Sequence, residues 1–98
     1  MPPRPAPHFV TGLDTLESEL LAEKAAALGR SAEAAKCALT KLKTCHERDE
    51  ARARLLKSAA RAVHHYFIQR ELCGLRRHDD AIRNLAIPRE VLVRLGAS

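Results

Sequence analysis

The chain of 98 residues has very few aromatic side chains: it contains Phe9, Tyr66 and Phe67, and no tryptophan. Aromatic rings bury the largest areas in protein cores, about 150–250 Å² each. Hydrophobic residues make up 46% of the sequence, but seventeen of them are alanine and fourteen are leucine. A core of this composition is thin, which argues against a large enclosed active site and favours self-association.

Long apolar segments are also missing, since no stretch approaches the roughly 20 apolar residues that cross a bilayer. The N-terminus, MPPRPAPHFVTG, is rich in proline and lacks the apolar segment of a secretory signal. Cysteine is scarce and odd in number, because Cys37, Cys45 and Cys73 form no pairing pattern. These features predict a soluble protein of the reducing cytoplasm that does not contact a membrane.

Charge is unevenly distributed along the chain. Lys and Arg number 17 against 12 Asp and Glu, which gives a formal net charge of +5. Residues 1–49 carry seven charges of each sign, so the whole basic excess lies in residues 50–98. A basic half indicates either an anionic partner, such as nucleic acid or an acidic protein, or ordinary solvated helix faces.

The organised part of this excess is a stripe of three cations, Arg54, Lys57 and Arg61, at a helical spacing of three and four. Lys36 and Lys43 add to a basic middle segment. Three cations in line can contact a phosphate backbone or an acidic protein. We therefore treat the three residues as a candidate anion-binding or partner-binding stripe.

Hydrophobic periodicity predicts a long first helix, over about residues 12–45, after a disordered proline-rich tail at residues 1–10. Thr11 and Asp14 are candidate N-cap residues of this helix. Because the apolar phase does not slip at Gly29, we predict one continuous helix. Its apolar residues lie three or four apart in one seam: Leu21, Ala25, Leu28, Ala32, Ala35, Leu39 and Leu42.

A second helix, predicted over about residues 49–73, is amphipathic and is followed by Gly74, a residue that suits the position after a helix end. Two long helices in sequence predict an antiparallel hairpin, and alanine at many seam positions allows the helix axes to approach closely. We therefore expect an all-α fold in which the hairpin dimerises into a four-helix bundle.

The C-terminal segment predicts two short helices, over about residues 79–86 and 88–95, with Pro88 opening the second. One interpretation is a cap that folds over the end of the hairpin and covers Leu72 and Leu75. The other is a weak likeness to a DNA-reading helix-turn-helix. With either interpretation, we expect residues 11–98 to form one helical domain.

Arg70 falls on the apolar seam of the second helix, where a guanidinium is costly unless it is paired. In an antiparallel hairpin, Glu17, Glu19 or Glu23 could pair with it. The sequence leaves two interpretations open: an ion pair that fixes the register of the helices, or a buried anion site.

Five histidines and three cysteines raise the question of metal binding or nucleophilic catalysis. No pair among them has the spacing of a zinc site. His78 has Asp79 and Asp80 beside it, but these carboxylates suit a helix N-cap better than a catalytic dyad. We expect no enzymatic activity, no metal and no cofactor.

Two segments are more distinctive: FIQRELCGLR at residues 67–76 and IPREVLVRLG at residues 87–96. They resemble the C-terminal signature of a small family of uncharacterised bacterial proteins, a domain of unknown function with a QRExCGLR segment and an IPxEVLxRLG ending. The resemblance implies no activity. It points to a structural junction, in which Arg70 and Glu71 tie the C-terminal helices to the hairpin. The residues of this junction are Gln69, Arg70, Glu71, Cys73, Gly74 and Pro88.

The sequence therefore favours a small, non-catalytic helical module for protein–protein interaction or structure, which forms a homodimer. The alternative is a basic accessory or regulatory protein that associates with nucleic acid.

Overall fold

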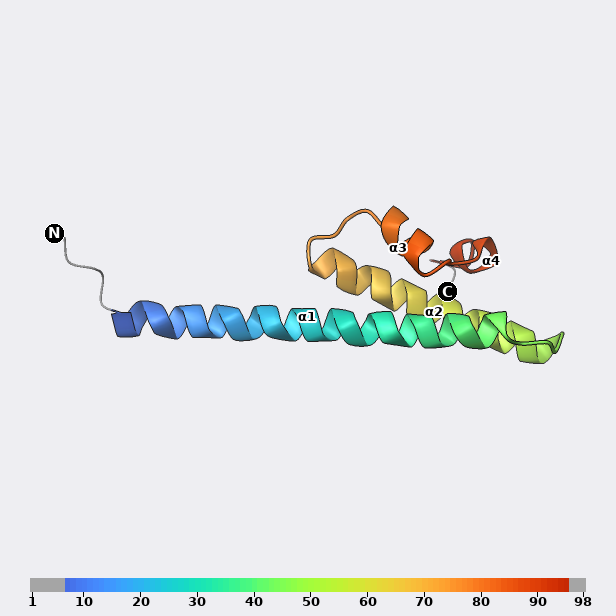
Figure 1. Cartoon of the computed structure of the whole chain (residues 1–98), viewed down its shortest axis with the longest axis horizontal. Coiled ribbons are helices and arrows are strands. Elements are labelled where there is room, and N and C mark those ends of the chain that lie inside the picture. Colours follow the sequence, from blue (N-terminus) through green and yellow to red (C-terminus); the bar gives the residue numbers. More distant parts are fainter. Residues whose placement is uncertain (1–6, 96–98) are drawn as a thin grey trace.

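The longest element is α1, Pro7–Lys43, a single helix of 37 residues. The computed structural model describes residues 7–95, and side chains from residue 12 onward. Helix α2 (Glu50–Leu72) returns antiparallel along the second half of α1, and α3 (Asp79–Asn84) and α4 (Arg89–Leu92) follow (Figure 1). Residues 7–95 contain no strand. The predicted all-α hairpin with two short C-terminal helices is confirmed.

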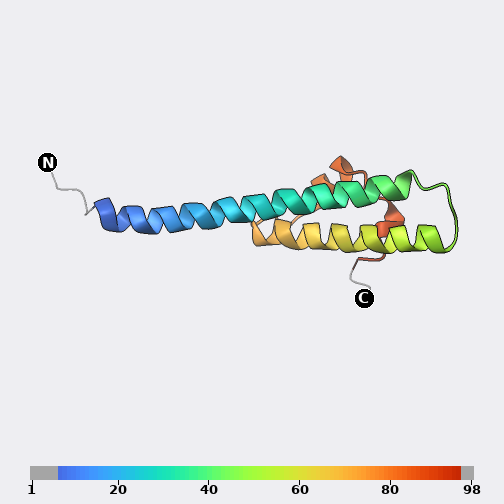
Figure 2. The same cartoon turned by 90° about the horizontal axis from the view of Figure 1, so that it is seen from below.

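Helix α1 extends far beyond the end of α2 (Figure 2). The Sγ atom of Cys73 lies 3.8 Å from the carbonyl oxygen of Lys24, so α2 ends level with Lys24. The Cα radius of gyration is 19.3 Å, compared with about 13 Å for a compact chain of 100 residues. We call residues 12–23 the arm; no other described helix lies beside it.

The core lies between the second half of α1, helix α2 and the C-terminal segment. Alanine is frequent in it, as the composition predicts, and this allows the two long helices to pack closely. The buried hydrophobic residues of the described chain are Ala35, Leu39, Leu42, Leu56, Ala59, Ala60, Val63, Phe67, Ala81, Ile87 and Val91.

The predicted seam of α1 is buried only where α2 runs beside it. Ala35, Leu39 and Leu42 are at most 2% exposed, whereas Leu21 is 66% exposed and Ala25 is also exposed. The helix is continuous through Gly29, as predicted. The N-terminal part of the seam is exposed because α2 is 14 residues shorter than the 37-residue α1 and does not reach it.

The helix bounds differ most from the predicted ranges at the N-terminus. Helix α1 begins at Pro7, where proline suits the first helical turn because its missing N–H would have no partner there. Thr11 and Asp14 therefore lie inside α1 and do not cap it. Residues 1–6, most of the predicted tail at 1–10, lie outside the described residues.

The C-terminal segment folds back along α2 and does not cover the free end of the hairpin. Leu72 and Leu75 are 60% and 43% exposed, so the interpretation that a cap covers them is wrong. The segment instead buries Ala81, Ile87 and Val91 in the core, and α4 packs on α2. At four residues, α4 is also too short to serve as a DNA-reading helix.

Helix α2 ends at a Schellman motif, a paired hydrogen-bond arrangement in which the residue after the C-cap is left-handed. The N–H of Leu75 donates to the carbonyl of Arg70 and the N–H of Gly74 to that of Glu71, both at 2.9 Å. Gly74 has φ +87°, a conformation that glycine adopts at little cost.

Helix α3 ends in the same way, but with alanine at the left-handed position. The N–H of Ile87 donates to the carbonyl of Ile82 at 3.0 Å, and the N–H of Ala86 to that of Arg83 at 3.1 Å. Ala86 has φ +49°. An L-residue in this conformation costs about 1–2 kcal/mol, so the end of α3 is strained.

Two substitutions test these helix ends, and a third inside α1 is the control. Gly74→Ala should lower the free energy of unfolding by about 1 kcal/mol, because a Cβ there meets no atom within 4 Å and the cost is backbone strain. Ala86→Gly should raise it by about 0.5 kcal/mol, since relief of strain exceeds the added chain entropy. Gly29→Ala, inside α1, is the control and should raise it by about 1 kcal/mol. Urea unfolding measures all three, and a Gly74→Ala protein as stable as the parent would contradict the assignment.

Candidate functional site

The arm carries a row of exposed leucines. Leu13, Leu16, Leu20 and Leu21 are 53%, 59%, 63% and 66% exposed. Large apolar side chains this open are informative when they gather on one element, because scattered single ones are ordinary. The spacing of three and four places Leu13, Leu16 and Leu20 on one stripe of the helix.

Leu13, Leu20 and Leu21 lie in line with buried or half-buried residues on the face of α1 that α2 covers, whereas Leu16 lies in line with Ala34, which is exposed. Eighteen residues complete five helical turns, so Leu13 lies in line with Ser31, and Leu21 with Leu39. Ser31 and Leu39 are 3% and 2% exposed. The apolar stripe of α1 therefore continues past the end of α2 into a region where nothing in the described chain covers it.

The arm is also uniformly acidic. It contains Asp14, Glu17, Glu19 and Glu23, and neither Lys nor Arg. Glu23 forms an ion pair with Arg30 at 2.8 Å, while no ion pair in the described chain involves the other three carboxylates. The arm thus combines leucines with uncompensated negative charge.

A hollow of about 370 Å³ lies against the arm, lined by Asp14, Thr15, Ser18, Glu19 and Ala22. These residues all come from α1, and the hollow is open to solvent. A single helix cannot surround a substrate or bring together groups from different elements, so this hollow is not the enclosed pocket of an enzyme.

The predicted basic stripe is present on α2, where Arg54, Lys57 and Arg61 are all exposed. Arg54 lies 3.9 Å from Glu50, and no ion pair in the described chain involves Lys57 or Arg61. The spacing of the three cations places them on one face of α2, as expected. This face points away from the core, which α2 contacts through residues such as Val63.

The same outer face of α2 becomes apolar toward its C-terminal end. Arg54, Arg61 and Ile68 recur every seven residues, and Leu72 follows one turn after Ile68. Ile68 and Leu72 are 39% and 60% exposed. The outer face therefore carries three cations followed by two exposed apolar side chains; we call these five residues the α2 outer face.

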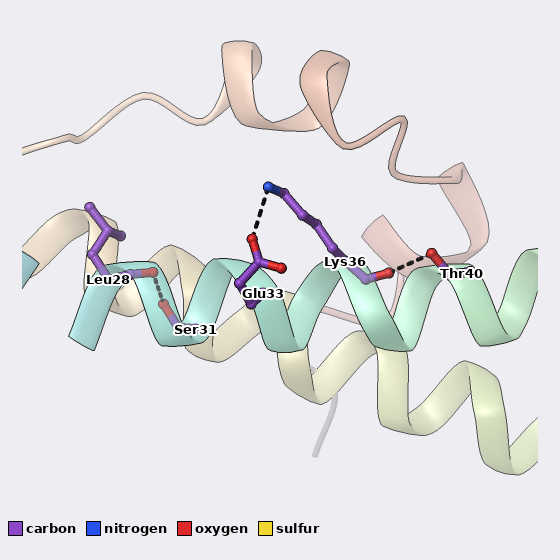
Figure 3. Close-up of polar contacts among 5 residues, drawn as sticks. All are labelled: Leu28, Ser31, Glu33, Lys36 and Thr40. Carbon is purple, nitrogen blue, oxygen red and sulfur yellow. Dashed lines mark hydrogen bonds and ion pairs between the residues drawn. The ribbon is translucent and has the colours of Figure 1, made fainter. Parts of the chain in front are cut away.

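Ser31, Lys36 and Thr40, in the second half of α1, form polar contacts within that helix (Figure 3). Ser31 donates through Oγ to the carbonyl of Leu28 at 2.8 Å, so this buried hydroxyl is satisfied without a group from α2. Thr40 donates to the carbonyl of Lys36 at 2.9 Å. Lys36 pairs with Glu33 at 3.2 Å, so its charge is already matched on its own helix.

The junction at the C-terminal end of α2 centres on His78. Its ring stacks on Phe67, with centroids 4.2 Å apart and planes at 4°. Arg70 donates from Nε to His78 Nδ1 at 3.1 Å and from Nη2 to the carbonyl of Arg77 at 2.8 Å. Glu71 Oε2 lies 3.1 Å from His78 Nε2. Because arginine can only donate, Nδ1 accepts and the imidazole hydrogen lies on Nε2.

The expectation that Glu17, Glu19 or Glu23 pairs with Arg70 is wrong. Arg70 contacts His78 instead, and Glu17, Glu19 and Glu23 belong to the arm, beyond the end of α2. Arg70 is half-buried beside the turn that leads to α3, so it holds that turn and does not set the register between α1 and α2.

Five of the six residues in the predicted junction gather at this end of α2. The carbonyl of Gln69 accepts a hydrogen bond from the N–H of Cys73 at 3.2 Å. Arg70 and Glu71 bind His78, Cys73 is the C-cap, and Gly74 is the left-handed residue. Pro88 lies apart, at the start of α4. The sequence offered no signal for the stack of His78 on Phe67, since neither periodicity nor spacing links the two.

A second contact missed by sequence reasoning joins α2 to α4. Arg52 binds Glu90 through two hydrogen bonds, of 2.9 Å from Nη1 to Oε2 and 2.5 Å from Nη2 to Oε1. These bonds hold the pKa of the Glu90 carboxyl below its ordinary value. Nearby, Lys43 donates to the carbonyl of Leu85 at 3.2 Å, so Lys43 also fastens the C-terminal segment and does not extend the basic stripe.

The Arg52–Glu90 pair predicts a pH-dependent stability. Because the pKa of Glu90 is lower in the folded chain, a proton binds the unfolded chain more strongly. The stabilisation is complete above the unfolded pKa of about 4.3 and is lost as the pH falls through the folded pKa. The difference in unfolding free energy between the native protein and Glu90→Gln should be constant near neutral pH and shrink in acid. Urea unfolding across this range measures it; Arg52→Gln should give the same profile, and a pH-independent difference would contradict the pairing.

The part of the chain that the structure describes contains no candidate metal site, no disulfide and no membrane-spanning helix. No group of three or more His, Cys, Asp or Glu side chains there could hold a metal ion. Cys37, Cys45 and Cys73 are free thiols. None of the described helices is long and apolar enough to cross a membrane. The two unusual features are therefore surfaces: the arm and the α2 outer face.

The chain matches a known protein family. A family model described as a family of unknown function (DUF6665) matches residues 6–98. No curated protein and no solved structure matches the chain. The match covers both the hairpin and the C-terminal segment and carries no information about a ligand or a reaction.

Proposed function

We propose that this chain, which belongs to the DUF6665 family of unknown function over residues 6–98, is a non-catalytic protein–protein interaction module whose arm binds a helical partner. The observation that carries the proposal is the exposure of Leu13, Leu16, Leu20 and Leu21, at 53% to 66%, on the part of α1 that no other described helix lies beside. The packed hairpin and the C-terminal segment hold the arm in a fixed direction.

Most helical stability in proteins comes from packing of an apolar face, and an isolated helix of fewer than about 12–15 residues is marginal in water. The arm has 12 residues, and it forms one continuous helix with the packed half of α1. A partner that covers the leucine stripe would supply the missing packing, at up to about 1.5–3 kcal/mol for each fully buried leucine.

The proposal places the protein in the cytoplasm and assigns it no catalytic step. Three free thiols suit a reducing compartment. The described surface presents leucines and charged stripes that match a protein partner better than a small substrate, because small-molecule sites are concave and bury most of the ligand.

Position-specific photo-cross-linking in cells tests the proposal. A benzophenone amino acid at Leu16 should give cross-linked products, and the same group at the exposed residue Cys37, on the packed half of α1, should not. Mass spectrometry identifies each product, so a second copy and a different protein are distinguished. Equal yields at both positions, or none at either, would refute the proposal.

The exposed cations of Arg54, Lys57 and Arg61 favour one alternative, association with nucleic acid. Three phosphate contacts would make duplex DNA affinity fall about 40-fold between 50 and 200 mM salt. The interaction-module proposal predicts no such binding in a fluorescence titration. Salt-dependent binding that is lost when all three cations are replaced by alanine would favour the alternative.

A further inference from the structure

We propose that the partner of the arm is a second copy of this chain, and that the arm lies on the α2 outer face of that copy. This inference rests on the proposed function, since it names the partner of the same surface. Two copies would exchange arms, so that each covers the exposed stripe of the other.

Seven of the eight large exposed apolar side chains in the described chain form two matching sets, and the eighth, Val93, lies apart from both. One set is the leucine stripe of the arm. The other lies at the C-terminal end of α2 and in the turn after it, where Ile68, Leu72 and Leu75 are 39%, 60% and 43% exposed. Each set is too small to form a core by itself, and each could cover the other.

The arm and the α2 outer face also carry opposite charges. Asp14, Glu17 and Glu19 give the arm uncompensated negative charge, while Lys57 and Arg61 give the α2 outer face positive charge without an ion-pair partner in the described chain. Opposite charges around an apolar contact select a partner and its orientation. Pairing of two arms with each other would instead bring like charges together, which opposes that arrangement.

The arm of one chain cannot reach the α2 outer face of the same chain. Helix α1 is continuous from Pro7 to Lys43, and the arm points away from α2 beyond Lys24 (Figures 1 and 2). A straight helix cannot fold back onto its own hairpin, so the acidic arm reaches a basic face only on another molecule.

The lengths and the register agree with a two-fold exchange. The arm is about 18 Å long and α2 about 35 Å, so the arm fits along α2. If each arm lies fully along α2 of the other copy, the two-fold axis lies level with Lys24, where α2 ends. The arm of one copy then runs parallel to α2 of the second copy. Cys73 lies level with Lys24 and is 49 positions later in the sequence. In the proposed dimer, each arm residue therefore lies beside the α2 residue of the second copy whose number is 49 higher. Leu20 then lies beside the helical turn that contains Ile68 and Leu72 of the second copy. Asp14 lies within one turn of the second copy's Arg61.

A charge-reversal experiment tests the proposal. The arm variant carries Asp14→Lys and Glu17→Lys; the face variant carries Lys57→Glu and Arg61→Glu. All four positions are exposed, so circular dichroism should show unchanged helicity. In light scattering, the native chain should be a dimer at micromolar concentration, and each variant alone should associate at least about tenfold more weakly.

The decisive sample is an equimolar mixture of the two variants. The basic arm of one then meets the acidic face of the other, and the second pair of surfaces is equally complementary, so dimers should return. Controls with the same net charge are Glu33→Lys with Glu47→Lys, and Lys41→Glu with Arg48→Glu, at exposed positions away from both surfaces; these should remain dimeric.

Three results would overturn the inference: a monomeric native chain, a mixture that stays monomeric, or an arm variant that dimerises more tightly, which would indicate contact between arms. If the native chain is monomeric but the cross-linker at Leu16 captures a different protein at this one position, the inference fails and the proposed function stands. If the cross-linker captures nothing, both fail.

Discussion

Leu16→Ala with Leu20→Ala is expected to weaken self-association roughly 1000-fold while the chain stays folded. Both side chains are about 60% exposed in the single chain, so their removal leaves no cavity in the hairpin core. In a two-fold dimer each substitution occurs twice, and four partly buried leucines contribute about 1 kcal/mol each, or about 4 kcal/mol in total. Alanine has the highest helix propensity, so the arm remains helical.

Sedimentation equilibrium measures this dissociation constant, and circular dichroism verifies that the helix content is kept. Val93→Ala is the matched control, because Val93 is an exposed apolar residue, 68% exposed, at the end of α4 and outside both surfaces. It should leave the dissociation constant unchanged. A double variant that associates as tightly as the native chain would show that the leucine stripe is not an interface.

Leu39→Ala is expected to lower the free energy of unfolding by about 3 kcal/mol. Leu39 is 2% exposed and belongs to the core between α1 and α2. Around it the core contains several alanines, which have no side-chain freedom with which to fill the cavity. For a domain with a total stability of about 5–15 kcal/mol this is a large fraction, equivalent to a fall of roughly 10–20 °C in Tm.

Thermal and urea unfolding of this variant should be carried out at concentrations low enough for the monomer to predominate, so that association does not contribute. Val93→Ala again serves as the control and should lie within about 0.5 kcal/mol of the native chain. A loss below about 1 kcal/mol for Leu39→Ala would indicate that the hairpin core is not packed as described.

The sequence was sufficient to predict the fold class, because the hairpin follows from local rules. Apolar spacing identified both long helices, and Gly74 marked the end of the second. The same spacing could not show that Leu21 and Ala25 are exposed while Leu39 is buried. Burial depends on whether a second helix is present, and helical periodicity is the same with or without one.

The candidate site was predicted only in part. The spacing of Arg54, Lys57 and Arg61 placed them correctly on one face, since that depends on a single helix. The partner assigned to Arg70 was wrong, because that prediction required the arm to lie beside α2. The contacts of Arg52 with Glu90 and of His78 with Phe67 join segments that no sequence period connects. Such contacts depend on the path of a short, irregular C-terminal segment.

The seventeen alanines acquire a structural role in this account. Those in the second half of α1 and in α2 allow close packing of the hairpin, whereas the arm is built mainly from leucine and acidic residues. In the proposed dimer, this division within a single helix would separate the packed hairpin from the association surface. It also explains why a thin core suffices, since dimerisation would add the apolar burial that one chain lacks.

The most direct test of the central claim is to map where the arm binds. A photo-cross-linking residue at Leu20 in the purified chain, mixed with isotope-labelled native chain, should give products that join the two chains. Mass spectrometry should locate the attachment around Ile68 and Leu72 of the labelled copy. Attachment to residues 12–23 of the labelled copy, or no product joining two chains, would contradict the claim that each arm lies on the α2 outer face of a second copy.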